Sequence, residues 1–118
     1  MRFTRPQHLR TAAEFNTVRT AGQRRDCGFF VVHLLPQPGR EPPVRRLGVI
    51  ASRRVGDAVR RNRAKRLLRE AFRLSQDRLP PSCDLVLVAR RSLAQGAIGP
   101  VRAQLAAVLE RMRENSAP

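Results

Sequence analysis

The segment DAVRRNRAKRLLREAFRLSQ, residues 57–76, combines a helical spacing of apolar side chains with a high density of positive charge. At about 100° per residue, its apolar side chains gather on one side: Ala64, Leu67, Leu68, Ala71 and Phe72. This spacing predicts an amphipathic helix that packs against a core. Asp57 is a favourable N-cap after Gly56, so we expect the helix to run from about residue 57 to 76.

The opposite side of this helix carries a continuous stripe of mostly basic residues. Its members recur at the spacing of one helical face: Asn62, Lys65, Arg66, Arg69 and Arg73, flanked by Arg61 and Arg63. Like charges at this spacing oppose helix formation, and Glu70 is the only acidic residue between Arg60 and Arg73 that relieves them. Because a solvated face normally mixes both signs, we interpret the stripe as a surface that binds RNA or DNA. A merely solvated face is the alternative.

Asn62 is the uncharged member of the stripe. Its amide can donate and accept hydrogen bonds together, which suits a base edge or a ribose 2′-hydroxyl better than a phosphate. A local hydrogen bond to the preceding turn explains the residue equally well, so both hypotheses stay open.

Upstream of this helix, the chain predicts another helix followed by two strands. Thr11 and Glu14 match a capping box that starts a helix over about 11–21, flanked by basic segments at 2–10 and 19–25. Two β-rich runs are interpreted as strands: 28–35 and 46–52. The proline-rich segment 36–43 between them is expected to be an exposed loop, across which the strands pair antiparallel.

Downstream, we expect a strand over 84–90 and a final helix after Gly99. The apolar residues of that helix form a core-facing stripe: Val101, Leu105, Val108, Leu109 and Met112. Residues 1–10 are expected to form a flexible basic arm, and 114–118 a frayed tail. The order α-β-β-α-β-α predicts a single-domain α+β sandwich, in which one small sheet packs on helices and leaves its other face open.

Alternation along the two upstream strands separates a core face from an open face. We assign Phe30, Val32, Leu34, Leu47, Val49 and Ala51 to the core, and Val31, His33, Gly48, Ile50 and Ser52 to the open face. Single-stranded RNA is held by flat groups on which bases stack, together with positive charge. Phe15 and His33 offer stacking surfaces, and Arg19 and Arg90 offer charge. Phe15 is equally consistent with an ordinary core residue.

The overall charge balance indicates a polyanionic partner. The 118 residues include 24 Lys and Arg against 9 Asp and Glu, which gives a net charge of +15. Lys65 is the only lysine, so nearly all of the positive charge comes from arginine. A GC-rich genome explains much of this preference for arginine over lysine, but it does not explain the scarcity of acidic residues. We find no membrane-span pattern, no secretory signal, and no zinc or disulfide spacing around Cys27 and Cys83. These features predict a cytoplasmic protein with reduced thiols.

The sequence predicts no autonomous active site and no metal site. His8 and His33 are the only histidines, and the carboxylates are scattered without a DxD or similar pair. Cleavage of RNA by acid–base catalysis needs a positioned acid and base, and a metal-dependent nuclease needs clustered carboxylates.

The segment from Ala58 to Phe72, with Arg-Asn-Arg at 61–63, resembles the hallmark helix of the bacterial ribonuclease P protein component. The resemblance includes Gly48, Ser52-Arg53-Arg54 and Gly56 upstream and Asp84–Arg90 downstream, and it covers residues 9–110 in all. It implies a small subunit bound to a large catalytic RNA in a ribonucleoprotein that needs Mg²⁺ and removes 5′ leaders from precursor tRNAs. It also implies the order α-β-β-β-α-β-α, with a left-handed βαβ crossover where the general rule favours the right-handed form.

The resemblance implies that this helix and the Ser-Arg-Arg segment before it face the catalytic RNA. The residues concerned are Arg53, Arg54, Arg61, Asn62, Arg63, Lys65, Arg66, Arg69 and Arg73. A cleft between the first helix and the open sheet face holds the leader through Phe15, Arg19, Val31, His33, Ser52 and Arg90. The family often has an aromatic residue where Arg19 aligns and a tyrosine where His33 aligns, so we expect leader binding here to rely more on arginine. A ribosomal protein or general RNA chaperone is the alternative function. A DNA-binding regulator is the third alternative, but the sequence has no helix-turn-helix pattern to support it.

Overall fold

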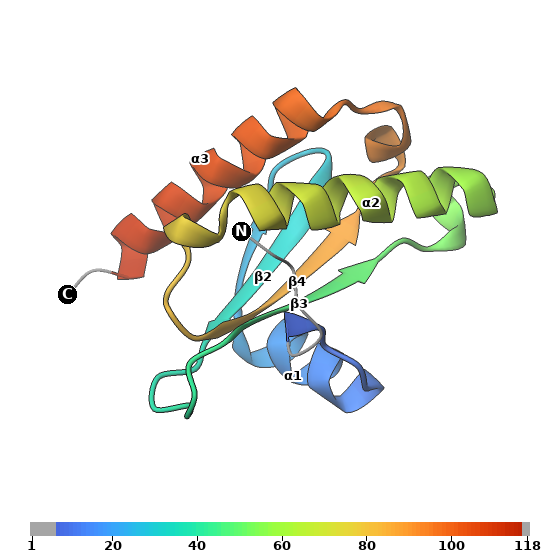
Figure 1. Cartoon of the computed structure of the whole chain (residues 1–118). Coiled ribbons are helices and arrows are strands. Elements are labelled where there is room, and N and C mark those ends of the chain that lie inside the picture. The colour runs from blue at the N-terminus through green and yellow to red at the C-terminus, as the bar shows by residue number, and fades with distance from the viewer. Residues whose placement is uncertain (1–6, 117–118) are drawn as a thin grey trace.

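A four-stranded sheet carries two long helices on one face and one short helix on the other (Figure 1). The computed structural model describes residues 7–116. Its helices and strands are α1 (Ala12–Ala21), β1 (Gln23–Asp26), β2 (Phe30–Pro36), β3 (Arg45–Ile50), α2 (Ala58–Leu74), β4 (Cys83–Ala89) and α3 (Ile98–Ser116). Three short 3-10 turns complete it: η2 (Arg53–Val55), η3 (Gln76–Arg78) and η4 (Arg91–Gln95). The α+β class predicted from the sequence is confirmed.

The antiparallel pairing expected between β2 and β3 is wrong, because β4 lies between them. The strand order is β1-β2-β4-β3, and β4 runs antiparallel to β2 and parallel to β3. An interior strand must be apolar on both faces, and Leu85, Val86 and Leu87 of β4 are fully buried on alternate faces. The connection 37–44 is long enough to cross β4, a step of roughly 10 Å between the outer strands.

The unit β3-α2-β4 is a left-handed crossover. In Figure 1, α2 lies on the sheet face toward the viewer. If the figure is turned so that β3 and β4 point upward, β4 lies to the left of its parallel neighbour β3. A connection that passes in front of the sheet and moves to the left is left-handed. This handedness is the one that the family resemblance implies, and it differs from the usual right-handed preference.

The residues of β1 gave no strand signal in the sequence. All four side chains of β1 are exposed, and its sequence QRRD has no apolar alternation. Pairing with β2 alone makes it a strand, in the register Gln23↔Leu34 to Asp26↔Val31. A charged, solvated edge strand of this kind also discourages unwanted pairing with other chains. The basic segment 19–25 is therefore the end of α1 followed by most of β1.

Apolar side chains of the sheet fall into two clusters, one on each face. The larger cluster joins the sheet to α2 and α3, and it contains Phe30, Val32, Leu34 and Leu47, as predicted. The smaller cluster lies under α1 and contains Leu9, Val18 and Val86, with Phe15, Leu35, Ile50 and Val88 packed against it. The predicted core stripe of α3 is confirmed, since all five of its residues are buried. The second sheet face is thus covered by α1 and open beyond it.

Residues 7–9 are docked on the sheet and do not form part of a flexible arm. His8 makes a parallel bridge with Leu47 at the outer edge of β3, and the Leu9 N–H donates to the Leu47 carbonyl at 2.9 Å. Gln7 Nε2 donates to Gln76 Oε1 at 2.8 Å. The arm expected over 1–10 is therefore wrong for this part, because the apolar Leu9 and the unpaired edge of β3 hold it; residues 1–6 lie outside the described residues.

At the other end of the chain, α3 continues through Ser116. Glu114 therefore lies in the last turns of α3, where a frayed tail was expected to begin, and residues 117–118 lie outside the described residues. The N-terminal end of α1 follows the prediction: Thr11 is the N-cap, and its capping box with Glu14 is fully formed.

Asp84 is the centre of an ion-pair network that ties α1, β3, β4 and the proline-rich loop together. The carboxylate of Asp84 is almost fully buried, and Arg40 and Arg46 each bind both of its oxygens at 2.8–3.1 Å. Arg46 Nη1 also donates to Glu14 Oε2 at 2.8 Å. Burial alone would raise the pKa of Asp84, but the hydrogen bonds from Arg46 and Arg40 outweigh it and hold this pKa below its ordinary value.

Candidate nucleic-acid interface

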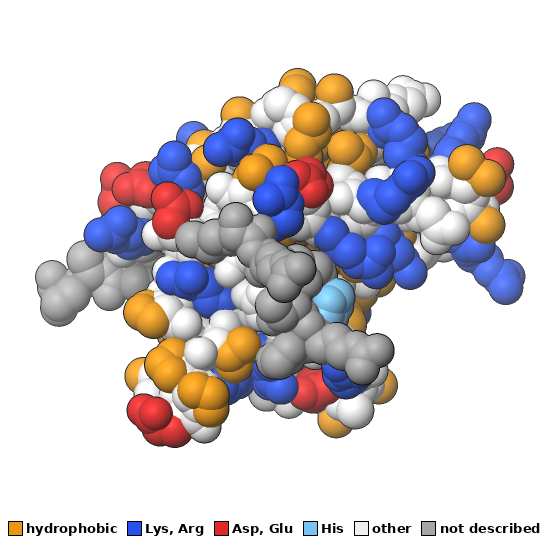
Figure 2. Space-filling model, viewed as in Figure 1, with side chains coloured by type: hydrophobic (Ala, Val, Ile, Leu, Met, Phe, Trp, Pro, Cys, Tyr) orange, Lys and Arg blue, Asp and Glu red, His pale blue; other side chains and the backbone are white. Residues whose placement is uncertain are grey.

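The basic stripe lies on the outer side of α2. Asn62, Arg66 and Arg69 are exposed, and Lys65 and Arg73 are half-buried. The opposite side of the helix is fully buried at Ala64, Leu68, Ala71 and Phe72, so the amphipathic pattern is confirmed. Figure 2 shows Lys and Arg side chains spread along α2 and around its N-terminal end. The helix therefore presents a convex, positively charged surface.

Arg53 and Arg54 extend this surface from α2 toward the end of β3. Both are exposed in η2, and α2 starts soon after them, with Asp57 Oδ1 accepting the Arg60 N–H at 3.0 Å. Gly56 makes this abrupt start possible, because its φ is 142° and a Cβ there would lie 2.7 Å from Arg60 Cδ.

Two arginines of α2 are held by contacts within the protein. Arg63 Nη1 donates to the carbonyl oxygens of Ala94 and Gly96 at 3.1 and 2.8 Å. Arg73 forms an ion pair with Glu70 one turn earlier. The predicted RNA-binding residue Arg63 therefore also anchors η4 and the segment before α3 to α2.

The side chain of Asn62 has no hydrogen-bond partner among residues 7–116. The local hydrogen bond to the preceding turn, one of the two hypotheses for this residue, is therefore not formed. The amide is exposed to solvent at the N-terminal end of the basic stripe, between Arg61 and Arg63.

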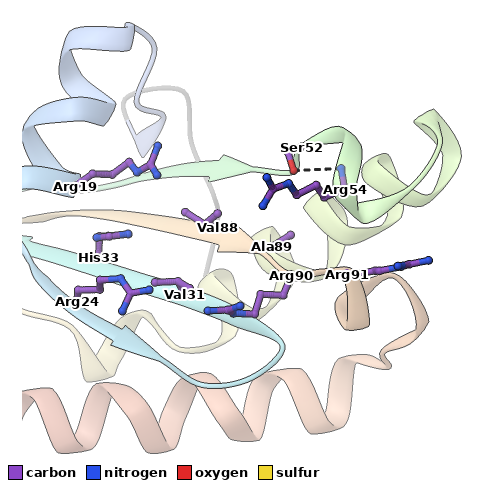
Figure 3. A pocket seen from close by; sticks show the side chains of 10 residues that line it. All are labelled: Arg19, Arg24, Val31, His33, Ser52, Arg54, Val88, Ala89, Arg90 and Arg91. Atoms are coloured by element: carbon purple, nitrogen blue, oxygen red, sulfur yellow. Dashed lines mark hydrogen bonds between the residues drawn. The ribbon is translucent and has the colours of Figure 1, made fainter.

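A cavity of about 620 Å³ lies on the second sheet face beyond α1 (Figure 3). Five of the six residues predicted for the leader cleft line it together: Arg19, Val31, His33, Ser52 and Arg90. They come from α1, β2, the segment before η2 and the end of β4. Arg24, Arg54 and Arg91 also line the cavity, and no carboxylate does so among the described residues. A concave surface of this charge suits an extended anionic chain.

The sixth predicted residue, Phe15, lies outside this cavity. It is half-buried and packs with Leu9, Val18 and Val86 between α1 and the sheet. A Cβ on Gly48 would lie 2.4 Å from Phe15 Cε2, so the absence of a side chain at Gly48 lets the ring rest on β3. The core interpretation of Phe15 describes this packing, and the stacking surface in the cavity is reduced to His33.

His33 is buried in the floor of the cavity, 6% exposed, between Arg19 and Arg24 (Figure 3). Burial, together with these two guanidinium groups, lowers the pKa of His33, so the ring is neutral at neutral pH. A neutral imidazole has one donor and one acceptor nitrogen. Nδ1 has no hydrogen-bond partner among the described residues, and such an orphaned buried atom is rare in proteins.

Sequence reasoning missed Arg24 and Arg91 and assigned Arg54 to the other surface. Arg24 pairs with His33 across the β1–β2 hairpin, so its place followed from a strand that the sequence did not indicate. Arg90 reaches the cavity but is already engaged in an ion pair with Asp26.

The thiols and carboxylates show no arrangement for chemistry. Within residues 7–116, no group of three or more His, Cys, Asp or Glu side chains is placed to hold a metal ion. Cys27 and Cys83 are free thiols, and burial raises the pKa of Cys27 to about 11 and that of Cys83 to about 12. Both thiols therefore stay protonated and are poor nucleophiles at neutral pH. Over the same residues, every helix is too short or too polar to cross a membrane.

Residues 3–113 match the family model described as Ribonuclease P. A ribonuclease P protein component from Oleidesulfovibrio alaskensis is 46% identical over 89 residues, which are 75% of this chain and 70% of that protein. One from Desulfatibacillum aliphaticivorans is 36% identical over 114 residues, 97% of this chain and 94% of that protein.

Solved structures of two RNase P proteins have the same fold. The Staphylococcus aureus protein superposes with a TM-score of 0.77 at 25% identity, covering 91% of this chain and 95% of that one. The Thermotoga maritima protein superposes with a TM-score of 0.75 at 30% identity, covering 88% and 96%.

Proposed function

The chain belongs to the bacterial ribonuclease P protein family and is the protein subunit of that endoribonuclease, and we propose that its two arginine-rich surfaces divide the work between two RNAs. The convex surface of η2 and α2 binds RNase P RNA, the partner that membership of the family implies. The cavity beside α1 holds the single-stranded 5′ leader of precursor tRNA. The enzyme acts in the cytoplasm, on RNA and not on DNA.

The observation that carries this proposal is the shape and chemistry of the second surface. Five arginines surround this cavity, no carboxylate of the described residues lines it, and the nearly fully buried imidazole of His33 lies in its floor. Arginines bind the phosphates of a single strand and can also stack on its bases, and the concave shape gathers them around one strand.

Arg53 and Arg54 connect the two surfaces. Arg54 lines the cavity, and α2 begins four residues later on the other side of the turn at Gly56. Leader and catalytic RNA bound in this way would meet at η2, so that the protein positions the substrate while the RNA carries out cleavage. In this proposal, Mg²⁺ is held by the RNA, because the described carboxylates are too far apart to form a binding cluster.

The chain alone is expected not to cleave precursor tRNA, and it is expected to promote correct 5′ processing when mixed with a bacterial RNase P RNA at moderate salt. The physical reason is the lack of a positioned acid–base pair beside a strong RNA-binding surface. The measurement is cleavage of end-labelled precursor tRNA with protein, RNA or both. Robust cleavage by the protein after nuclease treatment and repurification would overturn the assignment of catalysis to the RNA.

Arg24→Gln is expected to reduce the affinity of the holoenzyme for a precursor with a long leader by roughly five- to tenfold, the scale of one lost nucleotide contact. The affinity for a precursor with a single leader nucleotide should not change. Arg25→Gln is the matched control, because Arg25 is the next residue of the same exposed strand and does not line the cavity. Equal losses for Arg24→Gln and Arg25→Gln would show only a general charge effect and contradict a leader site in this cavity.

A further inference from the structure

The side of α2 that faces the start of α3 carries a groove whose apolar floor has no role in the proposed function. A hollow of about 690 Å³ has a floor of three apolar side chains: Leu67, Leu74 and Ile98. Ile98, the first residue of α3, is 37% exposed although it is large and hydrophobic. Figure 2 shows hydrophobic side chains between the arginines on this side of α2. Apolar side chains at the bottom of a hollow with a polar rim are typical of an interaction site.

The rim of the groove is strongly basic. Four arginines of α2 line it against one carboxylate, that of Glu70. This carboxylate is already paired with Arg73, whose hydrogen bond lowers the pKa of Glu70. A partner that combines negative charge with an apolar surface therefore complements the groove, and a nucleotide with its base has this chemistry. An acidic peptide with an apolar side chain has similar chemistry, but the arginines of the rim belong to the surface proposed to bind RNA, which favours a nucleotide.

The walls of the groove are fixed before any partner arrives. Arg63 is held by the carbonyl oxygens of Ala94 and Gly96, and Arg73 is held by Glu70. Ordering these side chains on binding costs little, because their rotamers are already selected. Arg66 is different: it is exposed on the rim and makes no hydrogen bond or ion pair with the described residues. Its guanidinium is available to stack on a base or bind a phosphate.

We propose that this groove receives an unpaired nucleobase of RNase P RNA, which lies against Leu67 and Ile98 with the Arg66 guanidinium beside it. The inference rests on the proposed binding of that RNA by α2, since Arg66, Arg69 and Arg73 belong both to the basic stripe and to the groove. Bases of loops and bulges are splayed out and bound by stacking in just such apolar, arginine-flanked places. The groove would add an apolar contact with one nucleotide to a surface otherwise based on charge.

The first test is the affinity of Ile98→Ser for RNase P RNA. We expect a loss of roughly three- to tenfold, the scale of one buried aliphatic contact. The dependence of affinity on salt should stay the same, because no phosphate contact is removed. Ile98 is an exposed residue of the first turn of α3, so the fold is expected to tolerate the change. Ala103→Ser is the matched control, because Ala103 is exposed on α3 and is not part of the groove.

Arg66→Ala separates failure of this inference from failure of the proposed function. If Arg66→Ala weakens binding while Ile98→Ser does not, α2 binds the RNA but the groove stays empty, and the inference is wrong. If neither variant weakens binding, the assignment of α2 to RNase P RNA is wrong as well. In a second test, p-benzoylphenylalanine in place of Ile98 should crosslink on irradiation to one unpaired nucleotide of RNase P RNA. Crosslinks only to precursor tRNA or to a second copy of the protein would overturn the proposal.

Discussion

Asp84→Ala is expected to lower the free energy of unfolding by about 3 kcal/mol, because it leaves two guanidinium groups without their shared carboxylate in a largely buried place. Arg40 and Arg46 converge on Asp84 from the proline-rich loop and from β3, with side chains 23% and 25% exposed. This partial exposure lets water reach them, so we expect the lower end of the usual cost of about 3–5 kcal/mol for breaking a buried ion pair. The measurement is urea denaturation followed by circular dichroism.

Asp77→Ala is the control, since Asp77 is an exposed aspartate in η3 that forms no ion pair among the described residues. We expect a change within about 0.5 kcal/mol for this variant, as is usual for surface substitutions. A loss for Asp84→Ala no larger than for Asp77→Ala would show that the network does not stabilise the fold.

The same network gives the stability of the protein a defined dependence on pH. The pKa of Asp84 in the folded protein lies below its ordinary value, so the carboxylate stabilises the fold fully above its unfolded pKa of about 3.9. This contribution is lost as the pH falls through the folded pKa. The difference in unfolding free energy between the natural protein and Asp84→Ala should therefore narrow below about pH 4. A constant difference down to pH 2 would contradict the ionised state assigned to Asp84.

Elements whose signals are local in the sequence were predicted well. The apolar spacing of α2, the N-cap at Asp57 and the capping box of Thr11 and Glu14 depend only on residues within one or two helical turns. The two faces of β2 and the core stripe of α3 follow in the same way from alternation and helical periodicity. Since most of the predicted cleft residues lie on these elements, five of them came together in one cavity.

Features that depend on distant partners could not be predicted. β4 lies between β2 and β3 because it is apolar on both faces. The length of the connection between β2 and β3 does not indicate that another strand lies between them. β1 exists because β2 offers it an edge, and its own residues favour no structure. The docking of Leu9 on β3 and the bonds of Arg63 to the chain before α3 likewise join segments that are remote in sequence. The additional arginines of the cavity are found only once these pairings are known.

Asn62→Ala is expected to weaken binding to RNase P RNA by about 1–3 kcal/mol, the cost of an unpaired hydrogen-bonding group in a desolvated interface. The amide has no partner within the described protein and stands between charged neighbours on the exposed side of α2. Thermal stability should therefore be unchanged or slightly higher, because alanine is the better helix former. The measurements are equilibrium RNA binding over a range of salt concentrations and thermal unfolding of the same variant.

The salt dependence separates the role of Asn62 from that of its basic neighbours. Asn62→Ala removes no charge, so the slope of log affinity against log salt should stay the same, whereas Arg66→Ala should lower it by about one unit or less. Asn62→Ala should also leave binding to a generic RNA duplex unchanged, because a directional contact to a base edge or 2′-hydroxyl is specific to the cognate RNA. A stable Asn62→Ala protein with full affinity for RNase P RNA would show that the amide makes no such contact. The stripe would then act through charge alone.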